Sequence, residues 1–115
     1  MSTLNFVSVN VRGLRQRAKR YSIFEWLKRC HLGEKSFTLL QETHSTPEIE
    51  SLWETDWGNK IIFNHGSSNS RGVLILLPKG HDYKIDVLFK DNSGRLMIIK
   101  IENDYLCRLY YYLQL

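Results

Sequence analysis

The feature that most constrains the fold is a strand, a helix and a second strand in close succession. Residues 4–11 alternate between two faces, as in a strand whose faces have different neighbours. Residues 16–31 place Ile23, Leu27 and Cys30 on one face of a helix, and Gly33 suits its end. Phe37–Gln41 is apolar enough for a strand covered on both faces. This order predicts a right-handed crossover between two parallel strands.

The rest of the sequence predicts a second helix and then strands. Thr46 and Pro47 suit the start of a helix that runs to Gly58, and Ser45 with Glu48 offers an alternative capping box. Turn-forming residues then separate five strand-like segments: residues 60–64, 72–77, 83–90, 95–101 and 105–113. We expect these strands to extend the parallel pair into one mixed sheet of the α/β (α+β-like) class, with one face left open.

Composition limits the kind of protein. A length of 115 residues with 43% hydrophobic residues suits one globular domain. No apolar run is long enough to span a membrane and no secretory signal is visible, so we expect an intracellular protein, nuclear or cytoplasmic. Cys30 and Cys107 are then expected to be small core residues rather than a disulfide. The tryptophans at positions 26, 53 and 57 lie on helical stripes and are expected in the core.

Positive charge gathers after the first strand. The net charge is +4, and five of the 16 Lys and Arg residues fall between Arg12 and Arg20. Two interpretations fit this stretch: a surface that faces the phosphates of a nucleic acid, or an ordinary solvated helix face.

Polar residues end both of the first two strands. Asn10 follows the first apolar run and Glu42 follows the second. The carboxyl ends of parallel strands are where open α/β sheets bind ligands, and carboxylate and amide oxygens suit Mg²⁺. The alternatives are that Asn10 bonds its own backbone in a turn and that Glu42 is a solvated residue beside a helix cap.

The phrases Val9-Asn10-Val11-Arg12-Gly13-Leu14 and Leu40-Gln41-Glu42-Thr43-His44 resemble an endonuclease/exonuclease/phosphatase domain. The chain is most similar to the amino-terminal half of the apurinic-type endonuclease of non-LTR (long interspersed) retrotransposons, over about residues 4–101. The resemblance implies that residues 1–115 are a truncated domain, half of a DNase-I-like four-layer α/β sandwich. It also implies Mg²⁺- or Mn²⁺-dependent hydrolysis of DNA phosphodiesters. In this family the residue matching Glu42 binds the catalytic metal, and that matching Asn10 helps hold the metal and the attacked phosphate.

The same resemblance implies contacts to nucleic acid. The segment Ser67 to Gly72 is similar to a Ser/Arg/Gly segment of the family, which makes Ser70 and Arg71 candidate phosphate contacts. Arg12 and His44, inside the two motif phrases, are further candidates. The alternatives are an ordinary hairpin loop at Ser70 and Arg71 and an exposed loop histidine at position 44.

Other parts of the family pattern are missing. The sequence has no Asp-x-Asn and no Ser-Asp-His motif, and the tyrosines at 110, 111 and 112 precede no proline, so which of them matches the family tyrosine stays open. We therefore expect a fragment that is inactive alone, whose partners are DNA and the missing carboxyl-terminal half. That half would supply the second sheet that covers the open face. A non-catalytic nucleic-acid-binding remnant and a fragment of a phosphatase branch are the alternatives; no membrane partner is expected.

Overall fold

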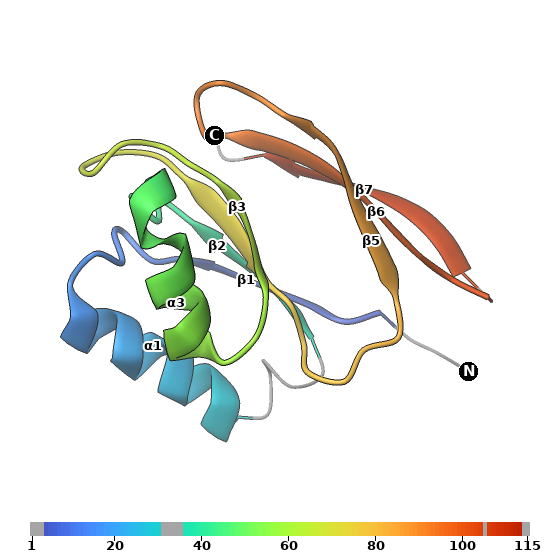
Figure 1. Ribbon diagram of the computed structural model, residues 1–115, viewed down its shortest axis with the longest axis horizontal. Coiled ribbons are helices and arrows are strands. Elements are labelled where there is room, and N and C mark those ends of the chain that lie inside the picture. The colour runs from blue at the N-terminus through green and yellow to red at the C-terminus, as the bar shows by residue number, and fades with distance from the viewer. Residues whose placement is uncertain (1–3, 31–35, 105, 114–115) are drawn as a thin grey trace.

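The computed structural model describes residues 4–30, 36–104 and 106–113, with side chains left out for 106 and 109–113. Two helices, one 3₁₀ turn and seven strands make up the described chain (Figure 1). In chain order they are β1 (Phe6–Asn10), α1 (Arg17–Arg29), β2 (Phe37–Gln41), the 3₁₀ turn η1 (Pro47–Ile49), α3 (Glu50–Trp57), β3 (Ile61–Asn64), β4 (Val73–Leu76), β5 (Lys84–Lys90), β6 (Leu96–Asn103) and β7 (Leu106–Leu113).

The strands form two separate sheets. The first has the order β1-β2-β4-β3, with β1 and β2 parallel and the other neighbours antiparallel. The parallel pair and the crossover through α1 are therefore confirmed. The second sheet is antiparallel, in the order β5-β6-β7. The expectation that these three strands extend the first sheet is wrong.

Both helices pack on one face of the first sheet (Figure 1). Phe24 and Leu27 of α1 and Trp53 and Trp57 of α3 are buried against residues of β2, β3 and β4. Burial of these large apolar side chains is the main favourable term for this layer, at about 25 cal/mol per Å² of apolar surface removed from water. The expectation that Trp53 and Trp57 are core residues is confirmed.

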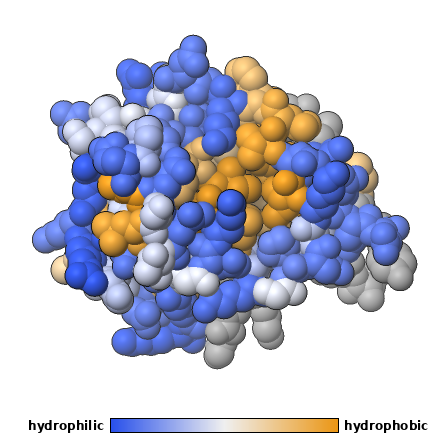
Figure 2. All heavy atoms as spheres, in the orientation of Figure 1, coloured by the Kyte–Doolittle hydropathy of each residue, from blue (hydrophilic) through white to orange (hydrophobic). Residues whose placement is uncertain are grey.

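The second sheet covers the opposite face of the first (Figure 1). Met97, Ile99 and Ile101 alternate along β6 and pack against Phe37 of β2 and Ile75 of β4. The expectation that this face stays open until a missing half covers it is wrong, because β5 and β6 already bury it. Figure 2 shows apolar side chains gathered between the two sheets, with a smaller apolar patch over the helices.

Three sequence-based core assignments are wrong. Trp26 is 49% exposed, and both Cys30 and Cys107 are free and exposed. The buried residues of α1 are Arg20, Phe24 and Leu27, so the buried stripe shares only Leu27 with the expected Ile23, Leu27 and Cys30. Arg20, a charged residue, occupies the inner face of the helix and forms an ion pair there with Asp56.

The second helix begins close to the predicted position. Thr46 is the cap and Pro47 occupies the first turn, but that turn is η1, and regular α-helix starts at Glu50. Gly58 ends α3 in a left-handed conformation with φ of 91°. The predicted helix stop at Gly33 lies outside the described residues. In the described part of the chain, no helix is long and apolar enough to cross a bilayer.

Candidate functional site

A polar cleft lies where the carboxyl ends of β1 and β2 meet the loop before β4 and the turn after β5. Its volume is about 440 Å³. One carboxylate, three arginines, a histidine and two small polar residues line it: Glu42, Arg12, Arg71, Arg95, His44, Asn69 and Ser70. The cleft therefore brings together Arg12, Glu42, His44, Ser70 and Arg71, which the sequence predicted as site residues.

Backbone hydrogen bonds hold the walls of this cleft together. The N–H of Gly13 donates to the carbonyl of Glu42 at 2.6 Å, and the N–H of Leu14 donates to that of Thr43 at 3.0 Å. On the other side, the N–H of His44 donates to the carbonyl of Arg71 at 2.8 Å. The loops thus continue the strand pairing beyond the sheet, which satisfies backbone groups that would otherwise lose their hydrogen bonds.

Left-handed backbone concentrates at the cleft. Among described residues other than glycine, positive φ occurs at Arg12 (51°), Glu42 (52°), His44 (59°) and Arg71 (62°), and all four line the cleft. L-residues adopt this conformation at an energetic cost, and such residues cluster where the surrounding structure fixes functional side chains. The left-handed backbone at these four positions therefore accompanies their place at one cleft, and it costs stability.

Gly72 lets two loops approach closely beside the cleft. Its φ is 93°, and an added Cβ would lie 2.6 Å from the hydroxyl oxygen of Thr43. Its N–H donates to the carbonyl of Gly94 at 3.2 Å, which ties the loop before β4 to the turn between β5 and β6. A side chain at position 72 would push these segments apart.

Asn10 and Glu42 lie at the same end of the first sheet. Asn10 is in register with Gln41, so the two residues follow neighbouring parallel strands as expected. Asn10 Oδ1 accepts a hydrogen bond from the N–H of Arg12 at 3.1 Å, which is the turn interaction weighed as its alternative role. Asn10 is not one of the described residues that line the cleft. Its role at a metal stays a prediction.

The cleft suits a metal ion only if that ion takes few ligands from the protein and prefers oxygen. The described residues contain no group of three or more His, Cys, Asp or Glu side chains arranged to hold a metal ion. Glu42 is the acidic residue among the described residues lining the cleft. Mg²⁺ is compatible with this, because it commonly takes one or two protein carboxylates and completes its shell with waters and substrate phosphate.

Two basic side chains near the cleft support its walls through hydrogen bonds. Arg15 donates to the Thr46 hydroxyl at 2.8 Å and to the carbonyl of His44 at 3.3 Å. Lys19 donates to the carbonyl of Arg12 at 3.1 Å. The basic stretch is therefore partly structural, a role that neither sequence interpretation included.

A turn centred on Asp91 holds Arg95 at the cleft. Asp91 Oδ1 accepts from the backbone N–H groups of Arg95 at 3.0 Å and Leu96 at 3.2 Å, and from Asn64 Nδ2 at 3.0 Å. Its Oδ2 accepts from the Ser93 hydroxyl at 2.6 Å. Desolvation opposes ionisation of Asp91, but these hydrogen bonds outweigh it and hold the pKa of the carboxyl well below its usual value.

A second polar network braces the loop that carries Glu42. His65 Nδ1 lies 3.0 Å from the Ser45 hydroxyl, and its Nε2 contacts the Glu50 carboxylate. Ser45 also accepts a hydrogen bond from Thr43 at 3.2 Å. Serine, histidine and glutamate are also the residues of some hydrolase catalytic triads. Ser45 is fully buried, however, and cannot contact a substrate. The network is therefore structural.

Sequence reasoning missed Arg95 and did not place the Asp91 turn at the cleft. The segment Asp91-Asn92-Ser93-Gly94 was predicted to be a turn, which is confirmed. Its place at the cleft depends on how the second sheet packs on the first. An available signal was Asp91 followed by Ser93 and Gly94, since an Asp that accepts several backbone N–H bonds organises a turn.

Comparison with known proteins gives one informative similarity. The chain is similar to a transposon-encoded protein. It is 29% identical over 98 residues to the Transposon TX1 uncharacterized 149 kDa protein of Xenopus laevis. The match covers 85% of this chain and 7% of the Xenopus protein, so the chain corresponds to a small part of that relative. No protein-family model matches the sequence.

Proposed function

We propose that the chain is the amino-terminal part of a metal-dependent DNA endonuclease domain of the retrotransposon type, with a DNase-I-like ancestry. The observation that carries the proposal is the cleft that gathers Glu42 with Arg12, Arg71 and Arg95. The similarity to a transposon-encoded protein supports the same origin. A nuclear or cytoplasmic location follows from this proposal.

Each cleft residue has a role in this proposal. The guanidinium groups of Arg12, Arg71 and Arg95 bind phosphate oxygens, for which their planar geometry is well suited. Ser70 and His44 add hydrogen bonds to the DNA backbone. Glu42, assisted by Asn10, would hold Mg²⁺ or Mn²⁺, which when bound neutralises charge that develops on the attacked phosphate.

Hydrolysis also needs a group that activates water, and this chain has no Asp-x-Asn or Ser-Asp-His sequence to supply it. We therefore expect the chain alone to bind DNA without nicking it. The natural partner would be a carboxyl-terminal segment that carries the remaining catalytic groups.

The test is binding to a fluorescein-labelled duplex, measured by anisotropy with and without Mg²⁺. Arg71→Gln should lower the affinity by roughly fivefold to tenfold. It should also make the slope of log affinity against log salt concentration shallower by about one. Lys79→Gln, an exposed cation beyond the opposite end of β4, is the matched control and should bind as the wild type does. Mg²⁺ should raise affinity for the wild type and not for Glu42→Gln.

The outcome separates the alternatives. Binding that depends on Arg71 but is indifferent to Mg²⁺ in both proteins would favour a non-catalytic nucleic-acid-binding remnant. Hydrolysis of a small phosphate ester would favour a phosphatase branch. Equal DNA affinity for Arg71→Gln and wild type would refute the proposed cleft.

A further inference from the structure

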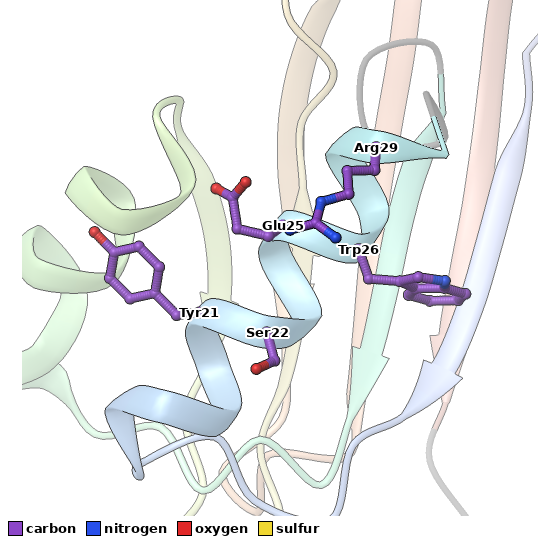
Figure 3. A pocket seen from close by; sticks show the side chains of 5 residues that line it. All are labelled: Tyr21, Ser22, Glu25, Trp26 and Arg29. Carbon is purple, nitrogen blue, oxygen red and sulfur yellow. The ribbon is translucent and has the colours of Figure 1, made fainter.

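The outer face of α1 carries exposed aromatic and basic residues that the cleft does not use. Tyr21, Ser22, Glu25, Trp26 and Arg29 surround a shallow hollow of about 310 Å³ (Figure 3). Trp26 is 49% exposed and Tyr21 is 41% exposed. In Figure 3 the two rings lie on opposite sides of α1, with Glu25 and Arg29 between them.

Charge identifies the kind of partner that suits this face. Residues 12–30 contain seven Lys or Arg and one acidic residue, a net charge of +6, whereas the rest of the chain carries nine basic and eleven acidic residues, a net charge of −2. Within this stretch Arg12, Arg15 and Lys19 belong to the cleft and its walls, and Arg20 is buried with Asp56. The remaining charges of α1 are those of Arg17, Lys28, Arg29 and Glu25, a net charge of +2. Such asymmetry favours a polyanion over an acidic or neutral surface.

Aromatic rings beside these cations add a second requirement. Arg17 lies over the Tyr21 ring, 5.3 Å from its centroid, and Trp26 is one helical turn from Arg29. Glu25 is paired with Lys28 at 3.7 Å, which offsets its repulsion of an anion. Exposed aromatic rings with arginines beside them suit unpaired nucleic acid, because bases stack on the rings while the arginines contact the adjacent phosphates.

We propose that the outer face of α1 binds single-stranded nucleic acid, with a base stacked on Trp26 and backbone phosphates on Arg17 and Arg29. This surface is separate from the cleft, because α1 leads away from Arg12, and the inference holds whether or not Glu42 binds a metal. A duplex cannot use it in the same way, since its bases are already stacked.

The protein offers a built-in reporter for this test. Of its three tryptophans, Trp53 and Trp57 are each 1% exposed, so a base that quenches tryptophan emission must contact Trp26. The probe is a twelve-residue oligothymidylate (about that length spans one such surface) titrated into the full chain. We expect saturable quenching with the oligonucleotide and little with a duplex of equal length.

Variants then assign the contact. Trp26→Leu should weaken oligothymidylate binding roughly tenfold, measured by anisotropy, and Trp26→Phe should recover most of it because a stacking ring remains. Leu52→Ala, which removes a 50% exposed apolar residue from α3, is the matched control and should bind normally. Circular dichroism spectra of all variants check that each protein is folded.

Three results would overturn the inference. The first is Trp26→Leu binding as tightly as the wild type. The second is equal quenching by polyglutamate, which would mean attraction by charge alone. The third is absence of quenching, as expected if this face serves a protein partner instead. Duplex binding that is unchanged by Arg71→Gln, together with Trp26 quenching by the oligonucleotide, would refute the cleft and leave this surface intact.

Discussion

Removing one member of the buried Arg20–Asp56 pair should be among the most damaging single changes to this protein. The side chains are 2% and 5% exposed, and Arg20 Nη2 lies 2.9 Å from Asp56 Oδ2. Arg20 also donates to the carbonyl of Leu14 at 2.9 Å and to that of Arg15 at 3.2 Å, and lies over the Trp53 ring. It therefore anchors the segment that joins the cleft to α1.

The magnitude follows from burial. Asp56→Ala leaves a guanidinium in the core without its counter-ion, a change that typically costs about 3–5 kcal/mol. For a chain of this size about 1 kcal/mol lowers the melting temperature by roughly 4 °C, so we expect a loss of roughly 12–20 °C. Arg20→Met should cost a similar amount, because it strands the Asp56 carboxylate and two backbone carbonyls.

A double variant distinguishes a buried charge pair from ordinary packing loss. Arg20→Met with Asp56→Leu removes both charges, so it should be less destabilising than the sum of the single variants by about 2 kcal/mol or more. Urea unfolding followed by circular dichroism measures the free energies. Glu25→Gln, which breaks only the partly exposed pair with Lys28, is the control and should cost less than about 1 kcal/mol. Additive single variants, or single costs below about 1 kcal/mol, would contradict this account.

Two further predictions concern the cleft. Gly72→Ala should destabilise the fold by about 1–3 kcal/mol, because φ of 93° and the 2.6 Å approach to the Thr43 hydroxyl both oppose a side chain; Gly80→Ala, with positive φ but open space, should cost less in the same urea assay. The folded pKa of Asp91 is lowered, so its stabilising contribution is complete above its unfolded value of about 4 and is lost as the pH falls through the folded value. Asp91→Asn should therefore lose stability at neutral pH and flatten the acid limb of a melting-temperature profile; an unchanged acid limb would count against the Asp91 turn.

The strand pattern predicted the first sheet better than the second. The parallel pair followed from alternation in residues 6–10 and the helix after it, because a helix between two strands leaves few alternatives. The partners of Leu96–Asn103 could not be predicted, because period-two alternation defines a buried face without specifying which sheet buries it. Val73–Leu76 is buried at all four positions, and such a strand already implied a sheet covered on both sides.

At the cleft, the predictable residues are those that follow strands in sequence. Glu42 and Arg71 adjoin β2 and β4, so a correct strand assignment brings them near one another. Arg95 comes from the other sheet, and its position depends on long-range packing that no local pattern records. The prediction that Trp26 is buried was wrong for a different reason. The apolar spacing of the helix left Arg20 outside the predicted stripe, whereas Arg20 is buried in an ion pair with Asp56.

The two sheets are joined at the cleft itself, which couples the stability of one to the geometry of the other. Asn64, at the end of β3, donates through Nδ2 to Asp91 Oδ1 and, at 2.8 Å, to the carbonyl of Leu96. The hydrogen bond from the N–H of Gly72 to the carbonyl of Gly94 is a second link between the two sheets. Loosening these contacts would move Arg95 relative to Glu42 without touching either residue. Asn64 is 6% exposed. Substitutions there would therefore alter anion binding by moving Arg95, without changing the charge of the cleft.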